Sequence, residues 1–115
     1  MAYVVKIKGP IHFKIYRGDT HAISVNFEVN TTKSYVYDGD YITFTVRDRV
    51  TKQVIFTDRQ VITKGSVYFI LKEEVTKRLR IKTYIYDLEY RKKDNSIVTT
   101  YIKGIMEVLE DVTYD

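Results

Sequence analysis

The sequence predicts an all-β, antiparallel sandwich of seven to nine short strands with one short helical turn. Strand-favouring tyrosine, valine, isoleucine, threonine and phenylalanine are abundant, whereas the chain has only five glycines and one proline. Apolar and polar residues alternate with a period of two in several segments, and turn-forming residues separate these segments at a spacing typical of a sandwich. A length of 115 residues predicts a single domain spanning residues 1–115.

The first predicted strands cover residues 4–8 and 13–16. Residues 23–29 show the clearest alternation, with apolar side chains at the odd positions, so that one face is expected to be buried and the other exposed. The same pattern predicts a strand over residues 42–47, and a shorter one over residues 54–57.

In the C-terminal half, residues 67–71 and 84–90 are predicted to be strands with two partly apolar faces. Two further strands are predicted over residues 97–102 and 105–109. Residues 72–80 are rich in charge and carry apolar residues four positions apart, which predicts one or two helical turns over one end of the sandwich.

Five segments contain glycine, asparagine or aspartate residues that accept turn dihedral angles. They are Gly9-Pro10, Arg17-Gly18-Asp19, Asp38-Gly39-Asp40, Lys64-Gly65-Ser66 and Lys93-Asp94-Asn95-Ser96. We interpret Arg17-Gly18-Asp19 as such a turn, in preference to an adhesion motif, because so short a tripeptide occurs by chance in many proteins.

Composition excludes several kinds of site. The absence of cysteine rules out disulfides and thiolate metal sites. The 19 basic and 15 acidic residues are interspersed, which predicts a solvated surface. The N-terminal residues lack a signal-peptide pattern, so we expect the whole chain to be made in the cytoplasm.

No residue pattern predicts an enzyme. The only histidines, His12 and His21, have no cysteine partners for a zinc site, and no serine lies in a nucleophile-elbow context. No phosphate-binding glycine loop occurs. Asp38 and Asp40 flank a glycine and are the best candidates for a metal ion, but adjacent turn carboxylates are usually only solvated. We therefore expect no catalytic, cofactor or metal site.

Asp87 lies within the tyrosine-rich segment 84–90, where a carboxylate is expected to be partly buried. A buried carboxylate requires a cationic or hydrogen-bonding partner, and Arg47 or Arg17 would supply one. Its expected role is fold specificity.

Tyr35, Tyr37 and Tyr41 gather around one polar loop. Tyrosine gives a large amphipathic contact area at low entropic cost, so these residues predict a subunit contact. The alternative is that the three rings only cap the edge of the sandwich.

A basic cluster, Arg91, Lys92 and Lys93, precedes the predicted Asp94-Asn95 turn. Together with Lys77, Arg78 and Arg80 it would form a patch for an acidic protein surface or for nucleic acid. Hairpin tips are also charged merely for solubility, and we expect no nucleic-acid partner.

The order of four segments resembles the small immunoglobulin-like domain of virion proteins from tailed phages and prophages, and is similar to the N-terminal domain of phage baseplate upper proteins. These segments are Arg17-Gly18-Asp19-Thr20 before a strand, the strand from Tyr41 to Asp48, the run from Gly65 into the charged residues 73–79, and Tyr84-Ile85-Tyr86-Asp87-Leu88-Glu89 before a polar hairpin. The resemblance implies an immunoglobulin-like sandwich without enzymatic activity.

The resemblance also implies a function. We expect a structural subunit of a phage or prophage particle, in the baseplate, tail, connector or head decoration, made in the host cytoplasm and located in the virion. Its partners would be other virion proteins or further copies of itself, with no membrane, nucleic acid or small-molecule substrate. The alternative is a module that binds carbohydrate or a host surface through the same tyrosines.

Overall fold

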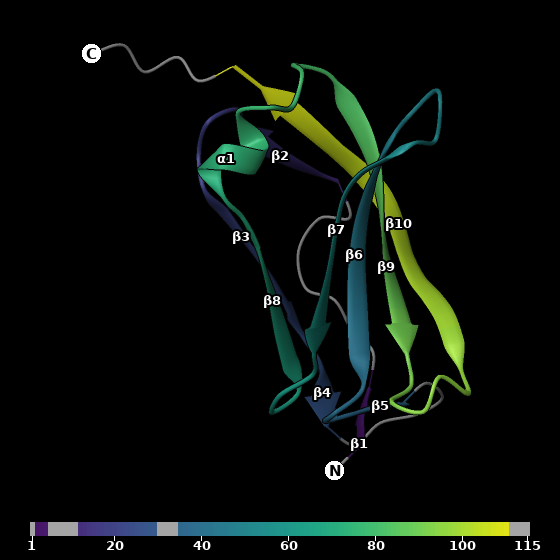
Figure 1. The fold of residues 1–115 in the computed structure, drawn as a ribbon. Coiled ribbons are helices and arrows are strands. Elements are labelled where there is room, and N and C mark those ends of the chain that lie inside the picture. Colours follow the sequence, from purple (N-terminus) through teal and green to yellow (C-terminus); the bar gives the residue numbers. More distant parts are fainter. Residues whose placement is uncertain (1, 5–11, 30–34, 111–115) are drawn as a thin grey trace.

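The computed structural model describes residues 2–4, 12–29 and 35–110, which form ten strands and one short helix (Figure 1). The elements are β1 (Ala2–Val4), β2 (Phe13–Tyr16), β3 (His21–Asn26), β4 (Glu28–Val29), β5 (Tyr35–Tyr37), β6 (Tyr41–Asp48), β7 (Val54–Val61), β8 (Ser66–Leu71), α1 (Glu73–Thr76), β9 (Thr83–Arg91) and β10 (Val98–Leu109).

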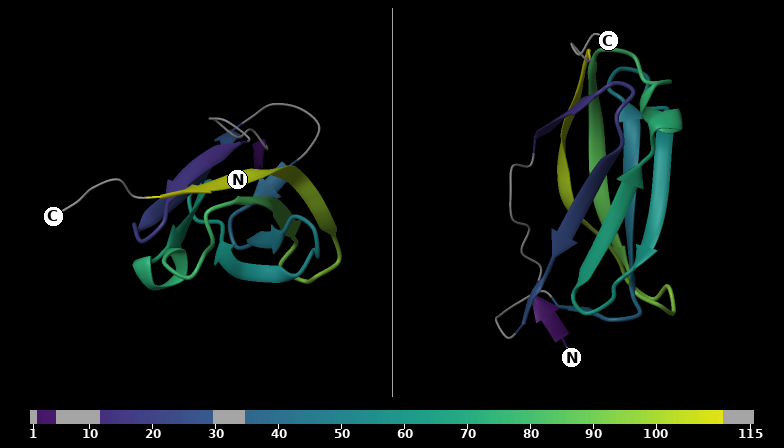
Figure 2. Two further views of the ribbon diagram at one scale, coloured as in Figure 1. Left: turned by 90° about the horizontal axis from the view of Figure 1, so that it is seen from above. Right: turned by 90° about the vertical axis from the view of Figure 1, so that its left-hand side faces the viewer.

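The strands form a sandwich-like arrangement of unequal layers. A five-stranded sheet has the order β2-β10-β9-β6-β7, and a two-stranded sheet, β3-β8, lies across one of its faces (Figure 2). A small sheet, β4-β1-β5, lies at the lower end in Figure 1. All pairings are antiparallel except that of β2 with β10, in which Phe13 is opposite Met106. The prediction of a purely antiparallel sandwich is therefore wrong at this pair.

The core lies between the two main sheets and is built from alternate residues. β9 shows the pattern most clearly, because Tyr84, Tyr86, Leu88 and Tyr90 are buried while the residues between them are half-exposed. Phe44 of β6 is at the centre, with its ring 5.5 Å from that of Phe69 and 5.6 Å from that of Tyr86. The strand content, with alternate residues buried in β8 and β9, confirms the all-β prediction.

Several boundaries differ from those predicted, and the strand count exceeds seven to nine. The two strands predicted over residues 97–102 and 105–109 are one strand, β10, which pairs with β9 through Lys103 and Gly104 and has a bulge between Thr100 and Ile102. Residues 23–29 are divided at the buried Phe27 into β3 and β4. Tyr35–Tyr37 is a strand, where a loop was expected. The Gly9-Pro10 turn and most of the predicted strand over 4–8 lie outside the described residues.

The upper end in Figure 1, which we call the α1 end, is held by one buried hydroxyl. Thr76 of α1 is fully buried; its Oγ1 donates to the carbonyl of Asp19 (2.7 Å) and accepts from the N–H of Gly18 (3.2 Å). Gly18 has φ +90°, as its predicted turn requires, and the Arg17 Nε–H donates to the Lys77 carbonyl. The Arg17-Gly18-Asp19 segment is thus a structural turn docked on α1.

Tyr84 adds a second hydrogen bond at the α1 end. It lies near the start of β9, its ring is buried, and its hydroxyl accepts from the backbone N–H of Arg80 at 2.9 Å. The bond spans only four residues, so it fixes the connection between α1 and β9. No helix in the described part of the chain is long and apolar enough to cross a membrane.

Candidate protein-binding surface

Two groups of residues far apart in the sequence meet at the end of the molecule opposite α1. Tyr37 ends β5 and Tyr41 begins β6, while Arg91, Lys92 and Lys93 lie where β9 turns toward β10 (Figure 1). Arg59 of β7 joins them from the neighbouring strand. We call these residues the β5-end patch: Tyr37, Tyr41, Arg59, Arg91, Lys92 and Lys93.

The patch combines aromatic rings with cations. The Lys92 Nζ lies 5.2 Å from the ring centre of Tyr37, and the Arg59 guanidinium lies 5.1 Å from that of Tyr41. Tyr41 is also directly opposite Arg91 in the β6–β9 pairing. Each exposed cation–π contact contributes about 0.5–1 kcal/mol. The patch therefore combines positive charge with aromatic surface.

Asp40 fixes the two halves of the patch to each other. Its side chain is only 4% exposed, and it accepts hydrogen bonds from the hydroxyl of Tyr90 and, at 3.0 Å, from the backbone N–H of Lys93. The Asp40 backbone N–H donates to the carbonyl of Tyr37 at 3.1 Å. Asp40 thus joins β5, through its backbone N–H, to the β9–β10 hairpin, through its carboxylate, and the burial of the carboxylate is compensated by the two donors from Tyr90 and Lys93.

The same carboxylate alters two tyrosines beneath the patch. Burial raises the pKa of Tyr90 far above its ordinary value, and the hydrogen bond to Asp40 raises it further. Burial, with the nearby Asp40 charge, also raises the pKa of Tyr101, whose ring centre lies 5.6 Å from that of Tyr90. Both phenols are therefore neutral at physiological pH, so Tyr90 remains a hydrogen-bond donor.

The predicted interface residues are partly brought together. Tyr37 is 42% exposed and Tyr41 is half-buried, so Tyr37 is the main aromatic contact available to a partner. The side chain of Tyr35 lies outside the described residues. Lys77, Arg78 and Arg80 do not join Arg91, Lys92 and Lys93, because they follow α1 at the opposite end (Figure 1). The expectation of one combined basic patch is wrong.

Asp38 and Asp40 do not share a site. Asp38 accepts from the backbone N–H of Gly65, while the Asp40 carboxylate is directed toward Tyr90 and Lys93. Each histidine accepts a backbone hydrogen bond: His12 from Ile105 and His21 from Tyr16, both at 3.0 Å. Among the described residues, no three histidine, aspartate or glutamate side chains come close enough to hold a metal ion.

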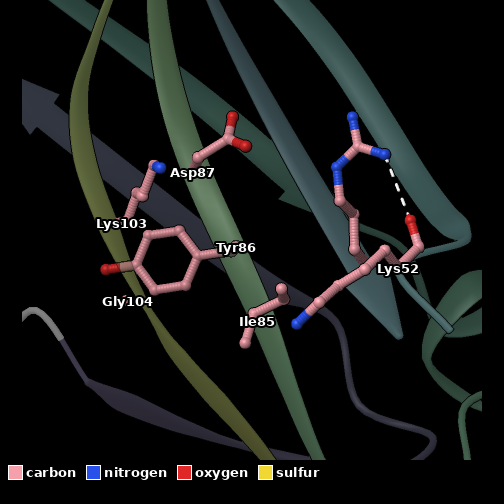
Figure 3. Close-up of a pocket in the computed structure, with 7 residues that line it drawn as sticks. Lys52, Ile85, Tyr86, Asp87, Lys103 and Gly104 are labelled. Carbon is pink, nitrogen blue, oxygen red and sulfur yellow. Dashed lines mark hydrogen bonds between the residues drawn. The ribbon is translucent and has the colours of Figure 1, made fainter. Parts of the chain in front are cut away.

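A second surface feature lies on the outer face of the five-stranded sheet. It is a hollow of about 470 Å³ lined by residues of β6, β9 and β10 and of the turn after β6: Arg47, Lys52, Ile85, Tyr86, Asp87, Lys103 and Gly104. Figure 3 shows the Lys52 and Lys103 side chains on opposite sides of β9, the strand that carries Asp87. The Arg47 guanidinium donates to the Lys52 carbonyl at 3.2 Å.

Asp87 meets the expectation of partial burial. Desolvation raises the pKa of Asp87, and the charge of Arg47 partly offsets the increase. Arg47 is therefore the nearby cation, whereas the Arg17 guanidinium is bonded to Lys77 at the α1 end. Three cationic side chains, of Arg47, Lys52 and Lys103, line the hollow together with the single carboxylate of Asp87. The excess of positive charge favours an acidic group of a partner.

Two important residues were not identified from the sequence. Arg59 was not considered, because its packing on Tyr41 depends on the β6–β7 register, in which Arg59 is opposite Thr43. Asp40 was considered only as a turn residue and a metal ligand. Its contact with Lys93 joins residues 53 positions apart, and the only local signal was a carboxylate next to a turn glycine.

Comparison of the chain with models of protein families finds no match, and comparison with curated proteins finds none either.

Proposed function

We propose that this chain is a non-enzymatic, immunoglobulin-like assembly domain of a tailed-phage or prophage particle, which binds an acidic protein surface through the β5-end patch. The observation that carries the proposal is the convergence of Tyr37, Lys92 and their neighbours around the buried Asp40. Tyrosine and arginine are enriched in protein interfaces, and the lysines of the patch add positive charge that favours an acidic partner.

Strand order supports the immunoglobulin-like part of the proposal. In such domains, strands C, F and G are neighbours in one sheet and strands B and E pair in the other. Here β6, β9 and β10 are neighbours, β7 extends their sheet, and β3 pairs with β8.

Tyr84 gives a second, independent indication of this fold. Immunoglobulin-like domains carry a tyrosine near the start of strand F whose hydroxyl bonds to the backbone a few residues upstream. Tyr84 has this position in β9, and its bond to the N–H of Arg80 has this span.

The phage part of the proposal is supported by the resemblance of segment order to virion immunoglobulin-like domains. Its test is quantitative mass spectrometry of purified particles from the source phage or induced prophage, counting this chain against the major capsid and tail-tube proteins. We expect hundreds of copies for a head decoration, or a few to tens for a connector, tail or baseplate subunit. Absence from the particles would overturn the virion assignment.

The contact surface is tested in the same particles with a matched pair of variants. Tyr37 and Tyr16 are 42% and 43% exposed, but Tyr16 lies at the α1 end. We expect Tyr37→Ala to lower incorporation into particles at an unchanged melting temperature, and Tyr16→Ala to have no effect. Equal incorporation of both variants would remove the β5-end patch from the proposal. Selective glycan binding by the purified protein, lost in Tyr37→Ala, would replace it with the carbohydrate-binding function.

A further inference from the structure

The turn between β7 and β8 begins a hairpin that does not continue. Lys64 and Gly65 form a two-residue turn with φ values of 51° and 71°, and hydrogen bonds of 3.0 and 3.1 Å join Thr63 to Ser66. Beyond this bridge, β7 continues in the five-stranded sheet and β8 in the two-stranded sheet. The two strands therefore diverge, and each is the last described strand of its sheet on that side.

Backbone polar groups of β8 face the gap left by this divergence. The Phe27 N–H donates to the Gly65 carbonyl at 2.8 Å, which continues the β3–β8 ladder. Successive residues of a strand direct their N–H and C=O groups to alternate sides, so those of Ser66, Tyr68 and Ile70 point away from β3. The Ser66 groups are used by Thr63, which leaves those of Tyr68 and Ile70 without a neighbouring strand among the described residues.

A groove follows this open side of β8. Two adjoining hollows, of about 530 and 280 Å³, share Gln60 of β7 and Tyr68 of β8 in their linings. Phe56 and Val75 contribute apolar surface to the larger hollow. Tyr68 and Ile70 are 60% and 51% exposed, so both the side chains and the free backbone groups of β8 are accessible.

The sequence of β8 lacks the devices that normally prevent an edge strand from pairing. Its residues, Ser-Val-Tyr-Phe-Ile-Leu, include no charge, no proline and no glycine. By contrast, β7, the edge of the other sheet, carries Asp58 and Arg59. An unprotected edge of strong β-formers is expected to have a strand partner in the assembled state.

We propose that this partner is β8 of a second copy of the chain, paired antiparallel across a two-fold axis. The free backbone groups select the register: Tyr68 of each copy is opposite Ile70 of the other, so that both pairs exchange two hydrogen bonds. Opposing Tyr68 to itself would leave only one usable pair, because the Ser66 groups are already bonded to Thr63.

Side-chain chemistry favours a second copy over an unrelated strand. In the proposed register each aromatic Tyr68 packs against a β-branched Ile70, a favourable cross-strand pair, and no like charges are opposed within β8. The contact is self-complementary, as a two-fold interface requires. It would join two β3-β8 sheets into one four-stranded sheet, and it does not depend on whether the β5-end patch binds a partner.

The test is sedimentation velocity of the purified full chain over a wide concentration range. We expect a monomer–dimer equilibrium whose dissociation constant rises at least about tenfold in the variant Tyr68→Lys/Ile70→Lys, which places lysine opposite lysine. Tyr16→Lys, at another surface-exposed tyrosine that lies on β2, should leave the equilibrium unchanged. A chain that stays monomeric at every concentration, or a dimer insensitive to the lysines, would overturn the proposal.

Cross-linking tests the register without relying on the lysine variants. The chain has no cysteine, so single variants Tyr68→Cys and Ile70→Cys each introduce one thiol. Hydrogen-bonded antiparallel pairs have Cα atoms about 5.5 Å apart, which matches disulfide geometry. In a glutathione redox buffer, a mixture of the two variants should form the mixed disulfide in preference to either symmetric one. Preferential formation of a symmetric disulfide would contradict this register.

Discussion

The two ends of the sandwich are each held by one buried polar side chain, but the two groups differ in charge. At the α1 end the neutral hydroxyl of Thr76 joins α1 to the turn at Gly18. At the opposite end the carboxylate of Asp40 joins the Tyr90 hydroxyl to the backbone of Lys93. Both groups need hydrogen-bond partners once they are buried, and the charged one requires the stronger donors.

The candidate binding residues lie at the end that holds the buried carboxylate. A carboxylate held under a surface attracts donors and cations, and the β5-end patch contains both aromatic rings and lysines arranged above Asp40. The α1 end has cations as well, but among the described residues no buried carboxylate orders them. The Asp40 carboxylate therefore both stabilises the fold and positions the residues of the candidate surface.

The largest effect is expected from Asp40→Ala. It leaves the Tyr90 hydroxyl and the Lys93 N–H without their acceptor, which should lower the free energy of unfolding by about 3 kcal/mol in urea titrations. Asp94→Ala removes an exposed carboxylate from the same hairpin, where it accepts from the Ser96 N–H, and should cost about 1 kcal/mol or less. Equal losses would show that Asp40 is no more than a turn residue.

Thr76→Val should have the next largest effect. The substitution keeps the volume and removes the hydroxyl that bonds to Asp19 and Gly18, at an expected cost of about 2 kcal/mol. Because no hydrogen bond among the described residues joins the two ends, the double variant Asp40→Ala/Thr76→Val should lose the sum of the single losses to within about 0.5 kcal/mol. A larger deviation would mean that the ends are coupled.

One chemical change made at both ends gives the sharpest comparison. Tyr90→Phe deprives the buried Asp40 of a donor and should cost about 2 kcal/mol. Tyr84→Phe frees only the N–H of the exposed Arg80, which water can satisfy, and should cost about 1 kcal/mol. Thermal and urea unfolding of the two variants measure both losses. A larger loss for Tyr84→Phe than for Tyr90→Phe would refute the view that the hydrogen bond to Asp40 is the more stabilising one.

The smallest effect concerns Asp87, between the two ends. Because burial raises its folded-state pKa, the ionised carboxylate is disfavoured in the fold above that pKa. Asp87→Asn should therefore be slightly more stable than the natural chain at pH 7, and the difference should vanish below the unfolded pKa of about 3.9. Urea titrations at pH 7 and pH 3.5 measure this, and a gain that persists at pH 3.5 would point to packing instead of charge.

Local patterns predicted most of the fold because they report burial directly. The alternation in β3 and β6 identified their buried faces, and the turns at Gly18 and Gly39 have the positive φ that glycine allows. The turn after β6 had no such signal. There Lys52 has φ 67° and the Asp48 carboxylate accepts from two backbone N–H groups, a role that an aspartate at a strand end does not reveal.

Most residues of the candidate surface could be predicted from the sequence, but their proximity could not. Tyr37 and the Arg91–Lys93 cluster are recognisable by residue type, but their proximity depends on the antiparallel pairing of β6 with β9. The contribution of Arg59 depends on the further pairing of β6 with β7. Residue type can thus nominate interface residues, whereas strand register decides which of them share a surface.

The parallel pairing of β2 with β10 affects how the chain can fold during synthesis. It joins residues 13–16 to residues 106–109, so the five-stranded sheet cannot be completed until residue 109 has left the ribosome. Contacts between such distant segments slow folding, because a long loop must close first. Until residues 98–107 have emerged, the edge of β9 that pairs with them is exposed. A nascent chain of this kind must avoid pairing with wrong strands.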